Sequence, residues 1–168
     1  MNGFNRNREE SASLNTKSKL NRYNRIKSQL YGLLPKSTDE QARMASVVAL
    51  LHHKMPHFFW TGFYELKAEK LIVKVYQGPI ACMELKKDTG VCWAAINSRK
   101  PVIVPDVHQF PGHIACDSRS KSEICIPYID KKGIITAVLD VDSDVFNNFD
   151  SVDETELHSI LSLIKEVP

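Results

Sequence analysis

The spacing of apolar residues changes twice along this chain, and this change limits the folds that it can adopt. Residues 20–51 carry apolar side chains at every third or fourth position, which predicts helices. From Phe58 to Asp142 the spacing is mostly two, which predicts strands, and after Ser151 it becomes helical again. Because no long helix interrupts the strands, we expect one mainly antiparallel sheet with helices packed on it, an α+β domain.

Three segments have the pattern of helices that pack by one face. The first carries apolar residues at Leu20, Tyr23, Ile26, Leu30 and Leu33. The second is predicted to open at Ser37, where Glu40 three residues later completes a capping-box pattern, and to end near Pro56. The third is predicted to open with the same pattern, at Ser151 and Glu154.

The predicted strands are short and lie between these helices. The first strand has one face made of Trp60, Gly62, Tyr64 and Leu66, and the second has one made of Leu71, Val73 and Val75. Further strands are expected over residues 80–85, 102–104, 122–129 and 134–142, with a short apolar helix over residues 91–96. Asp130–Gly133 joins the last two strands, and we expect a hairpin turn there.

Length, charge and hydropathy exclude several classes of protein. A chain of 168 residues fits one domain. Residues 1–16 are polar and aperiodic, so we expect a disordered leader before a single domain over residues 17–168. The net charge of +2 is too small to favour nucleic acid, and we interpret the basic residues before Pro35 as a solvated face. No apolar run, Val47–Leu51 and Val91–Ile96 included, is long enough for a membrane span, and without a secretory signal a cytoplasmic location is expected.

Residues 105–121 show neither helical nor strand spacing, and loops of this length are often functional. This stretch holds one of the four cysteines, which are Cys82, Cys92, Cys116 and Cys125. Their spacing includes no C-x-x-C pair, so neither a zinc ribbon nor a thioredoxin-type motif is present. In a reducing compartment a structural disulfide is not expected. Three interpretations stay open from composition: buried apolar side chains, a metal site, or redox chemistry.

The last two strands place acidic residues on one face. If the ends of the Asp130–Gly133 turn pair with each other, Glu123 lies opposite Asp140. Asp142 and Cys125 then share that face, while the reverse face is apolar. Like charges opposite one another repel, so one carboxyl group is expected to hold its proton to a higher pH than usual. Such a group can act as a general acid, and an ionised neighbour can bind an ammonium group.

Six stretches in the middle of the chain form a set of motifs. They are Trp60–Tyr64, Tyr76–Gly78, Ala81–Cys82, Gly90–Cys92, Asp106–Asp117 with Ser122–Ile124, and Leu139–Ser143. In order and spacing these stretches resemble the free methionine-(R)-sulfoxide reductases, which are built on a GAF domain. The resemblance covers about residues 57–150 and implies a GAF-like catalytic domain.

The resemblance implies an oxidoreductase that reduces free L-methionine-(R)-S-oxide to methionine. Cys116 matches the catalytic cysteine, which would attack the sulfoxide sulfur and become a sulfenic acid. Cys82 and Cys92 match the two other family cysteines, and either could condense with the sulfenic acid to form a disulfide; we favour Cys82. Thioredoxin, or dithiothreitol in vitro, would reduce this disulfide, so neither a bound cofactor nor a metal is expected.

The resemblance also assigns roles to side chains around the reacting cysteine. Asp142 would be the general acid, and Glu123 and Asp140 would contact the substrate. Trp60 and Tyr64 would enclose its S-methyl group. A homodimer and a role in repair after oxidative stress are also implied.

Two positions depart from the pattern of the family. Trp93 stands where the family usually has glycine, and its ring could narrow the site or shift Cys92. Cys125 stands where the family usually has an aliphatic residue, and we interpret it as a small buried apolar side chain. His108 and His113 flank the loop and are expected to hydrogen-bond its backbone.

Two alternatives compete with this interpretation. A GAF domain can also be a non-catalytic sensor of a small ligand, because a fold does not fix function. A zinc site could be made by Cys82, Cys92 and Cys116 with His108 or His113, although the closely spaced ligand pairs typical of zinc sites are missing. An assay for methionine would separate the sensor from the enzyme, and elemental analysis would detect the zinc.

Overall fold

The computed structural model describes residues 4–113 and 116–166, with side chains from Thr16 onward. Its sheet has six strands in the order β3-β2-β1-β6-β5-β4, and neighbouring strands run antiparallel. The strands are β1 (Phe58–Lys67), β2 (Lys70–Gln77), β3 (Glu84–Leu85), β4 (Val102–Val104), β5 (Ser122–Ile129) and β6 (Ile135–Ser143). The helices are α1 (Phe4–Leu33), α2 (Glu40–Lys54), α3 (Gly90–Ser98) and α4 (Ser151–Glu166), with short 3-10 turns at Leu34–Lys36 and Val107–Gln109. The predicted α+β class is confirmed.

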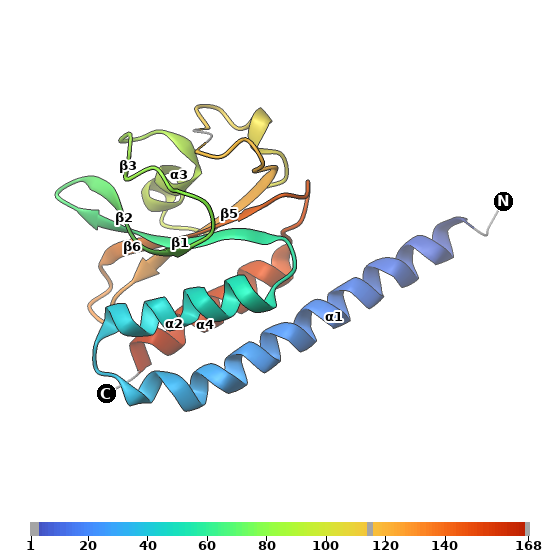
Figure 1. Ribbon diagram of the computed structural model, residues 1–168. Helices are drawn as coiled ribbons and strands as arrows, with labels where there is room; N and C mark the ends of the chain where they lie inside the picture. Colours follow the sequence, from blue (N-terminus) through green and yellow to red (C-terminus); the bar gives the residue numbers. More distant parts are fainter. Residues whose placement is uncertain (1–3, 114–115, 167–168) are drawn as a thin grey trace.

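Helices lie on both faces of the sheet (Figure 1). α1, α2 and α4 are stacked on one side, whereas α3 and the long loop after β4 lie on the other. The strands alternate accordingly: Phe63 and Leu139 pack with the three long helices, while Trp60 and Tyr64 face the side of α3. Polar groups on the α3 side are therefore shielded from water by a helix and a loop.

α1 begins at Phe4, within the segment for which the sequence analysis expects disorder. The N-terminal half of this helix extends past the rest of the domain (Figure 1). The expectation of disorder rested on polar composition, but arginine, glutamate, alanine and leucine in this segment favour helix locally. The division into a leader and a domain over residues 17–168 stays a prediction.

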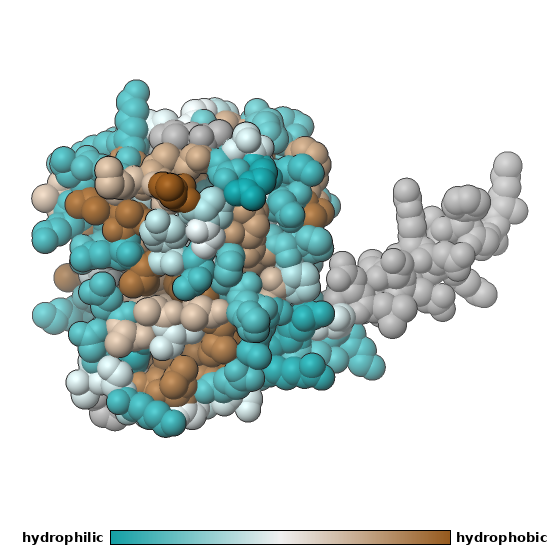
Figure 2. All heavy atoms as spheres, viewed as in Figure 1, coloured by the Kyte–Doolittle hydropathy of each residue, from teal (hydrophilic) through white to brown (hydrophobic). Residues whose placement is uncertain are grey.

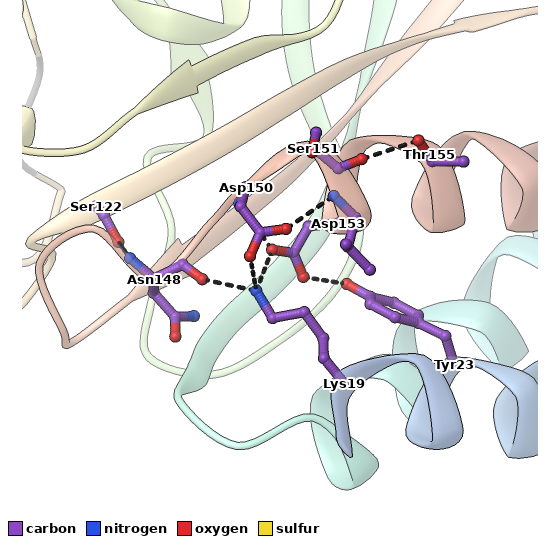
Figure 3. A network of polar contacts seen from close by, with 9 residues as sticks. Lys19, Tyr23, Ser122, Asn148, Asp150, Ser151, Asp153 and Thr155 are labelled. Atoms are coloured by element: carbon purple, nitrogen blue, oxygen red, sulfur yellow. Dashed lines mark hydrogen bonds and ion pairs between the residues drawn. The ribbon is translucent and has the colours of Figure 1, made fainter. Parts of the chain in front are cut away.

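A buried polar network joins α1 to the start of α4 (Figure 3). The Tyr23 hydroxyl donates to Asp153 at 2.7 Å, and the Lys19 ammonium lies 2.6 Å from Asp153 and 2.8 Å from Asp150. Tyr23 and Asp153 are both fully buried. Because a buried carboxylate is stable only when its hydrogen bonds and charge are compensated, this network fixes the position of α1.

Two helix caps differ from the predicted ones. α2 is capped by Asp39, whose carboxylate accepts a first-turn backbone N–H, whereas Ser37 only accepts the N–H of Asp39. At α4 the cap is Asp150, whose carboxylate accepts a first-turn N–H and whose own N–H donates to Asp153. The predicted cap Ser151 is already the first helical residue. An aspartate carries a full negative charge at the positive helix end, which favours it over serine there.

The hairpin of β5 and β6 has a different register from the predicted one. Glu123 pairs with Asp142 and Cys125 pairs with Asp140, each two residues further along β6 than predicted. The turn accounts for one residue of this shift, because the backbone N–H of Asp130 bonds to the carbonyl four residues later, and an irregularity between Tyr128 and Ile129 accounts for the other. A shift of two residues keeps every side chain on its face. The shared face of the acids and the apolar reverse face are therefore confirmed, while the pairing was wrong.

Two predictions near β2 are only partly right. Val75 packs on the opposite face from Val73, because the pairing of β2 with β1 is irregular between them. Of residues 80–85 only β3 forms a strand, and Ile80 is exposed.

Exposed apolar side chains lie as separate patches among hydrophilic ones (Figure 2). They include Ile80 and Met83 on the segment before β3, and Val145 and Phe146 after β6. No helix within the described residues combines the length and the apolar character that a bilayer span requires.

Candidate active site

The α3 side of the sheet carries two rows of side chains that cross three strands. In the first row Trp60 on β1 pairs with Asp142 on β6, which pairs with Glu123 on β5. In the second row Gly62 pairs with Asp140, which pairs with Cys125. The register of the sheet thus brings three carboxyl groups together from residues far apart in the sequence.

A cavity that is partly open to solvent lies over these rows. Glu123, Asp140 and Asp142 form its floor, and the start of α3 contributes Cys92 to its wall. Cys116 reaches it from the long loop. Trp60 and Tyr64 line it as well. Seven of the eight residues that the sequence analysis assigned to one site therefore line one cavity, and the eighth, Cys82, does not line it.

Cys116 is joined to Cys82 by a disulfide bond. Cys82 lies on the segment between β2 and β3 and Cys116 on the loop before β5, so the bond links the two loops beside the cavity. Cys116 is exposed and Cys82 is half-buried. Tyr64 donates a hydrogen bond to the backbone carbonyl of Cys82 at 3.1 Å, which positions this loop against β1. The motif residues 114 and 115, next to Cys116, lie outside the described residues.

Cys92 and Cys125 are free thiols and both are buried. Their Sγ atoms are 3.4 Å apart. Burial raises the pKa of both thiols, so they stay protonated near neutral pH. Cys125 is buried as expected, but its surroundings are polar: its thiol donates toward Glu123 and Asp140. The interpretation of Cys125 as an ordinary apolar side chain is therefore incomplete.

Two carboxyl groups on the floor, those of Asp140 and Asp142, hold protons more tightly than usual. Desolvation, and then the neighbouring Glu123 carboxylate, raises the pKa of Asp142 to about 8. Burial also raises the pKa of Asp140. Ser120 donates a hydrogen bond to Asp142, which acts in the opposite direction. The expected proton-holding acid is thus present, and Ser120 is a contributor that the sequence analysis did not name.

Aromatic rings form one wall of the cavity. The rings of Trp60 and Tyr64 are stacked with centroids 5.8 Å apart, and Tyr76 stacks on Trp60 at 5.5 Å. Gly62 lies between them on β1, where a Cβ atom would come within 2.5 Å of the Trp60 ring. The glycine therefore allows the indole to lie flat across the strand.

The two histidines of the loop differ in position. His113 lines the cavity, with its Nε2 atom 3.6 Å from Glu123, and this contact raises the pKa of the imidazole. His108 is exposed and lies 2.8 Å from Asp106. Both imidazoles thus face carboxylates rather than the expected backbone groups, His108 in a hydrogen bond and His113 in an ion-pair contact. Trp93 is buried beneath the site without lining the cavity, so its ring does not narrow it.

The zinc site considered from the sequence does not form. Cys82 and Cys116 are bonded to each other, Cys92 lies with Cys125, and His108 does not reach the cavity. The compact group of metal-ligand side chains found among the described residues is instead Cys92, Glu123, Cys125 and Asp140.

Comparison with known proteins decides the family. No protein-family model matches the chain. The free methionine-R-sulfoxide reductase of Escherichia coli is 38% identical over 135 residues, which cover 80% of this chain and 81% of that protein. The chain belongs to the free methionine-R-sulfoxide reductase family.

Two further similarities extend the comparison. GAF domain-containing protein A of Dictyostelium discoideum is 46% identical over 156 residues, covering 92% of this chain and 98% of that protein. The structure of the Neisseria meningitidis free methionine-R-sulfoxide reductase in complex with its substrate superposes with a TM-score of 0.81 at 33% identity, covering 86% of each chain. The fold of this family member is a GAF domain, as expected.

Proposed function

We propose that this protein reduces free methionine-(R)-sulfoxide to methionine by thiol chemistry at Cys116. The observation that carries the proposal is the disulfide between Cys82 and Cys116, set at a cavity with three carboxyl groups on its floor. The E. coli and N. meningitidis relatives carry the name of this activity, and the latter structure contains its substrate.

The disulfide state is the product of a balanced two-step reaction. In the reduced protein the Cys116 thiolate attacks the sulfoxide sulfur and forms an S–S bond to it, while the sulfoxide oxygen takes up a proton. The oxygen then passes from the substrate sulfur to the Cys116 sulfur and the S–S bond breaks, so that methionine leaves and Cys116 becomes a sulfenic acid. The Cys82 thiol then attacks this sulfur, water leaves, and the S–S bond forms. Two thiols supply the two electrons that the sulfoxide takes up. The observed bond supports Cys82, rather than the buried Cys92, as the partner of Cys116.

The three carboxyl groups on the floor of the cavity have two roles in this proposal, proton donation and binding of the substrate ammonium group. Asp142, with its pKa raised to about 8, keeps its proton near neutral pH and donates it to the departing oxygen. Glu123 and Asp140 lie beside it and receive the α-ammonium group of the free amino acid. Trp60 and Tyr64 enclose the S-methyl group.

Regeneration requires an external dithiol, which attacks the disulfide and leaves both cysteines reduced. Exposure of Cys116 supports access by a protein such as thioredoxin. A homodimer, a cytoplasmic location and a role in repair after oxidative stress belong to the same proposal. The proposed reaction uses no bound cofactor.

The test is methionine production from free methionine-(R)-sulfoxide with dithiothreitol, followed by chromatography. Wild type should turn over repeatedly, and Cys116→Ser should not, because an alcohol is a much weaker nucleophile than a thiolate. Cys125→Val is the matched control and should remain active. Binding of the sulfoxide without methionine production would favour the non-catalytic sensor.

A further inference from the structure

Two thiols with no step in the proposed reaction lie in one buried cluster with two carboxyl groups. Cys92 Sγ is 3.4 Å from Cys125 Sγ. Cys125 Sγ is in turn 3.1 Å from Glu123 Oε1 and 3.5 Å from Asp140 Oδ1. One ligand atom from each of the four residues lies within 4.8 Å of the other three, and all four side chains are buried.

We propose that this cluster is a binding site for a thiophilic divalent cation of the zinc type. A tetrahedral zinc ion with sulfur ligands at about 2.3 Å and oxygen ligands at about 2.0 Å places two sulfurs about 3.8 Å apart, and a sulfur and an oxygen about 3.5 Å apart. The three separations given above lie within about 0.4 Å of these edges, and the remaining ligand atoms lie within 4.8 Å of one another. Small side-chain movements are therefore enough to admit the ion.

The donor set selects the class of ion. Two thiolates and two carboxylates suit zinc or cadmium, and thiolates disfavour magnesium and calcium. A cation would also compensate the mutual repulsion of buried acidic groups. Binding replaces the two thiol protons by the metal, so neither an oxidant nor a reductant is needed.

The backbone holds the four ligands in place. Cys92 belongs to the first turn of α3, Glu123 and Cys125 are two residues apart on β5, and Asp140 pairs with Cys125 from β6. The second oxygen of Glu123 faces His113 at 3.6 Å. Such an outer contact orients a carboxylate ligand.

The site overlaps the cavity in which we propose that the substrate binds. Cys92, Glu123 and Asp140 all line that cavity. A metal ion on the two carboxylates would occupy the place of the substrate ammonium, so metal and substrate should exclude each other. This consequence rests on the proposed function, whereas metal binding itself does not.

Cobalt titration tests the metal site directly. In the Cys82→Ala/Cys116→Ala protein, Cys92 and Cys125 are the remaining thiols of the four in the chain. Cobalt should bind once per chain, with thiolate-to-cobalt charge-transfer absorption and the intense visible bands of tetrahedral cobalt, and zinc should displace it. If that variant does not fold, the titration is made on the wild-type disulfide form, in which the same two thiols are free.

Further substitutions in the same background identify the ligands. Cys125→Val should remove the charge-transfer absorption and weaken binding by more than roughly 100-fold, since loss of an outer-shell partner alone costs up to that much. Asp140→Asn should weaken binding, while the same change at the neighbouring Asp142 should leave the tetrahedral bands in place. Absence of the thiolate absorption, or its survival in Cys125→Val, would overturn the site.

Competition separates this proposal from the proposed function. Turnover is measured with a phosphine reductant, because dithiols chelate zinc. Zinc should raise the apparent KM for the sulfoxide, and a chelator should reverse the effect. Turnover without any cobalt signal would contradict the proposed metal site and would leave the proposed reductase function unaffected. A cobalt signal with zinc-insensitive turnover would contradict the placement of the substrate ammonium on Glu123 and Asp140.

Discussion

The carboxyl groups of Glu123 on β5 and Asp142 on β6 lie directly opposite one another at the floor of a cavity. Burial, and after it the repulsion between these two carboxyl groups, raises the pKa of Asp142 to about 8 and so provides a proton near neutral pH. An arrangement that lowers the stability of the sheet thus creates an acid beside the Cys82–Cys116 pair.

The pH dependence of stability should reveal the proton on Asp142. Its pKa is about 8 in the folded protein, whereas an aspartic acid in an unfolded chain has a pKa of about 4. The folded state therefore binds the proton more tightly, and its contribution to stability is complete below about pH 4 and lost as the pH rises toward 8. Asparagine has no such proton, so the free energy of unfolding of Asp142→Asn should rise relative to that of wild type by about 5 kcal/mol between pH 4 and pH 8. Urea unfolding at several pH values measures this, and a difference independent of pH would contradict it.

The turnover rate should depend on pH through the protonation of Asp142. If Asp142 is the acid, kcat falls as the pH rises through about 8. Asp142→Asn should lower kcat by roughly 10²- to 10⁴-fold with a smaller change in KM, and should abolish that fall. Ser120 donates to Asp142 and holds its pKa down, so Ser120→Ala should move the fall to higher pH. A pure KM effect in Asp142→Asn would transfer the role to another carboxyl group.

A single methyl group at Gly62 should disturb the aromatic wall. A Cβ atom there would lie 2.5 Å from the Trp60 ring and 2.5 Å from Tyr76 Cβ, so the indole must move. Gly62→Ala should therefore raise KM and destabilise the fold by about 1–3 kcal/mol. The control is Gly32→Ala on α1, where nothing lies within 4 Å and no effect on KM is expected. Equal KM values for both variants would argue against contact between Trp60 and substrate.

The hydroxyl of Tyr23 should contribute to the attachment of α1. Tyr23→Phe removes its 2.7 Å hydrogen bond to the buried Asp153 and should destabilise the protein by about 1–3 kcal/mol. Tyr31 on the same helix is 62% exposed, so Tyr31→Phe should change stability by less than about 0.5 kcal/mol. Denaturant unfolding of both variants measures the difference, and similar values would show that the network does not hold the helix.

Faces of strands could be predicted from the sequence, but registers could not. Alternation alone placed Glu123, Asp140 and Asp142 on one side, and a shift of two residues leaves this assignment unchanged. The pairing depended on the turn after Asp130 and on the irregularity between Tyr128 and Ile129, and no residue pattern indicated either. The irregularity in the pairing of β1 with β2, which turns Val75 to the other face, was also missed because no residue pattern indicates it.

Contacts between segments that are distant in the sequence could not be predicted either. The motifs identified Cys92, but its neighbour Cys125 was interpreted as apolar because only the fold brings α3 onto β5. Ser120 and the caps Asp39 and Asp150 were missed because each depends on local backbone geometry rather than on spacing. The acidic residues and the aromatic residues that the motifs singled out nevertheless lie around one cavity.

The most direct measurement is a single addition of free methionine-(R)-sulfoxide to the fully reduced protein without external reductant, followed by peptide mass spectrometry. One methionine should form per chain, and the cross-linked peptides should join Cys82 to Cys116 while Cys92 and Cys125 remain free. Cys82→Ser should stop at a sulfenic acid on Cys116 that a sulfenic-acid probe labels. Formation of methionine with Cys116 unmodified and outside any disulfide would contradict this account.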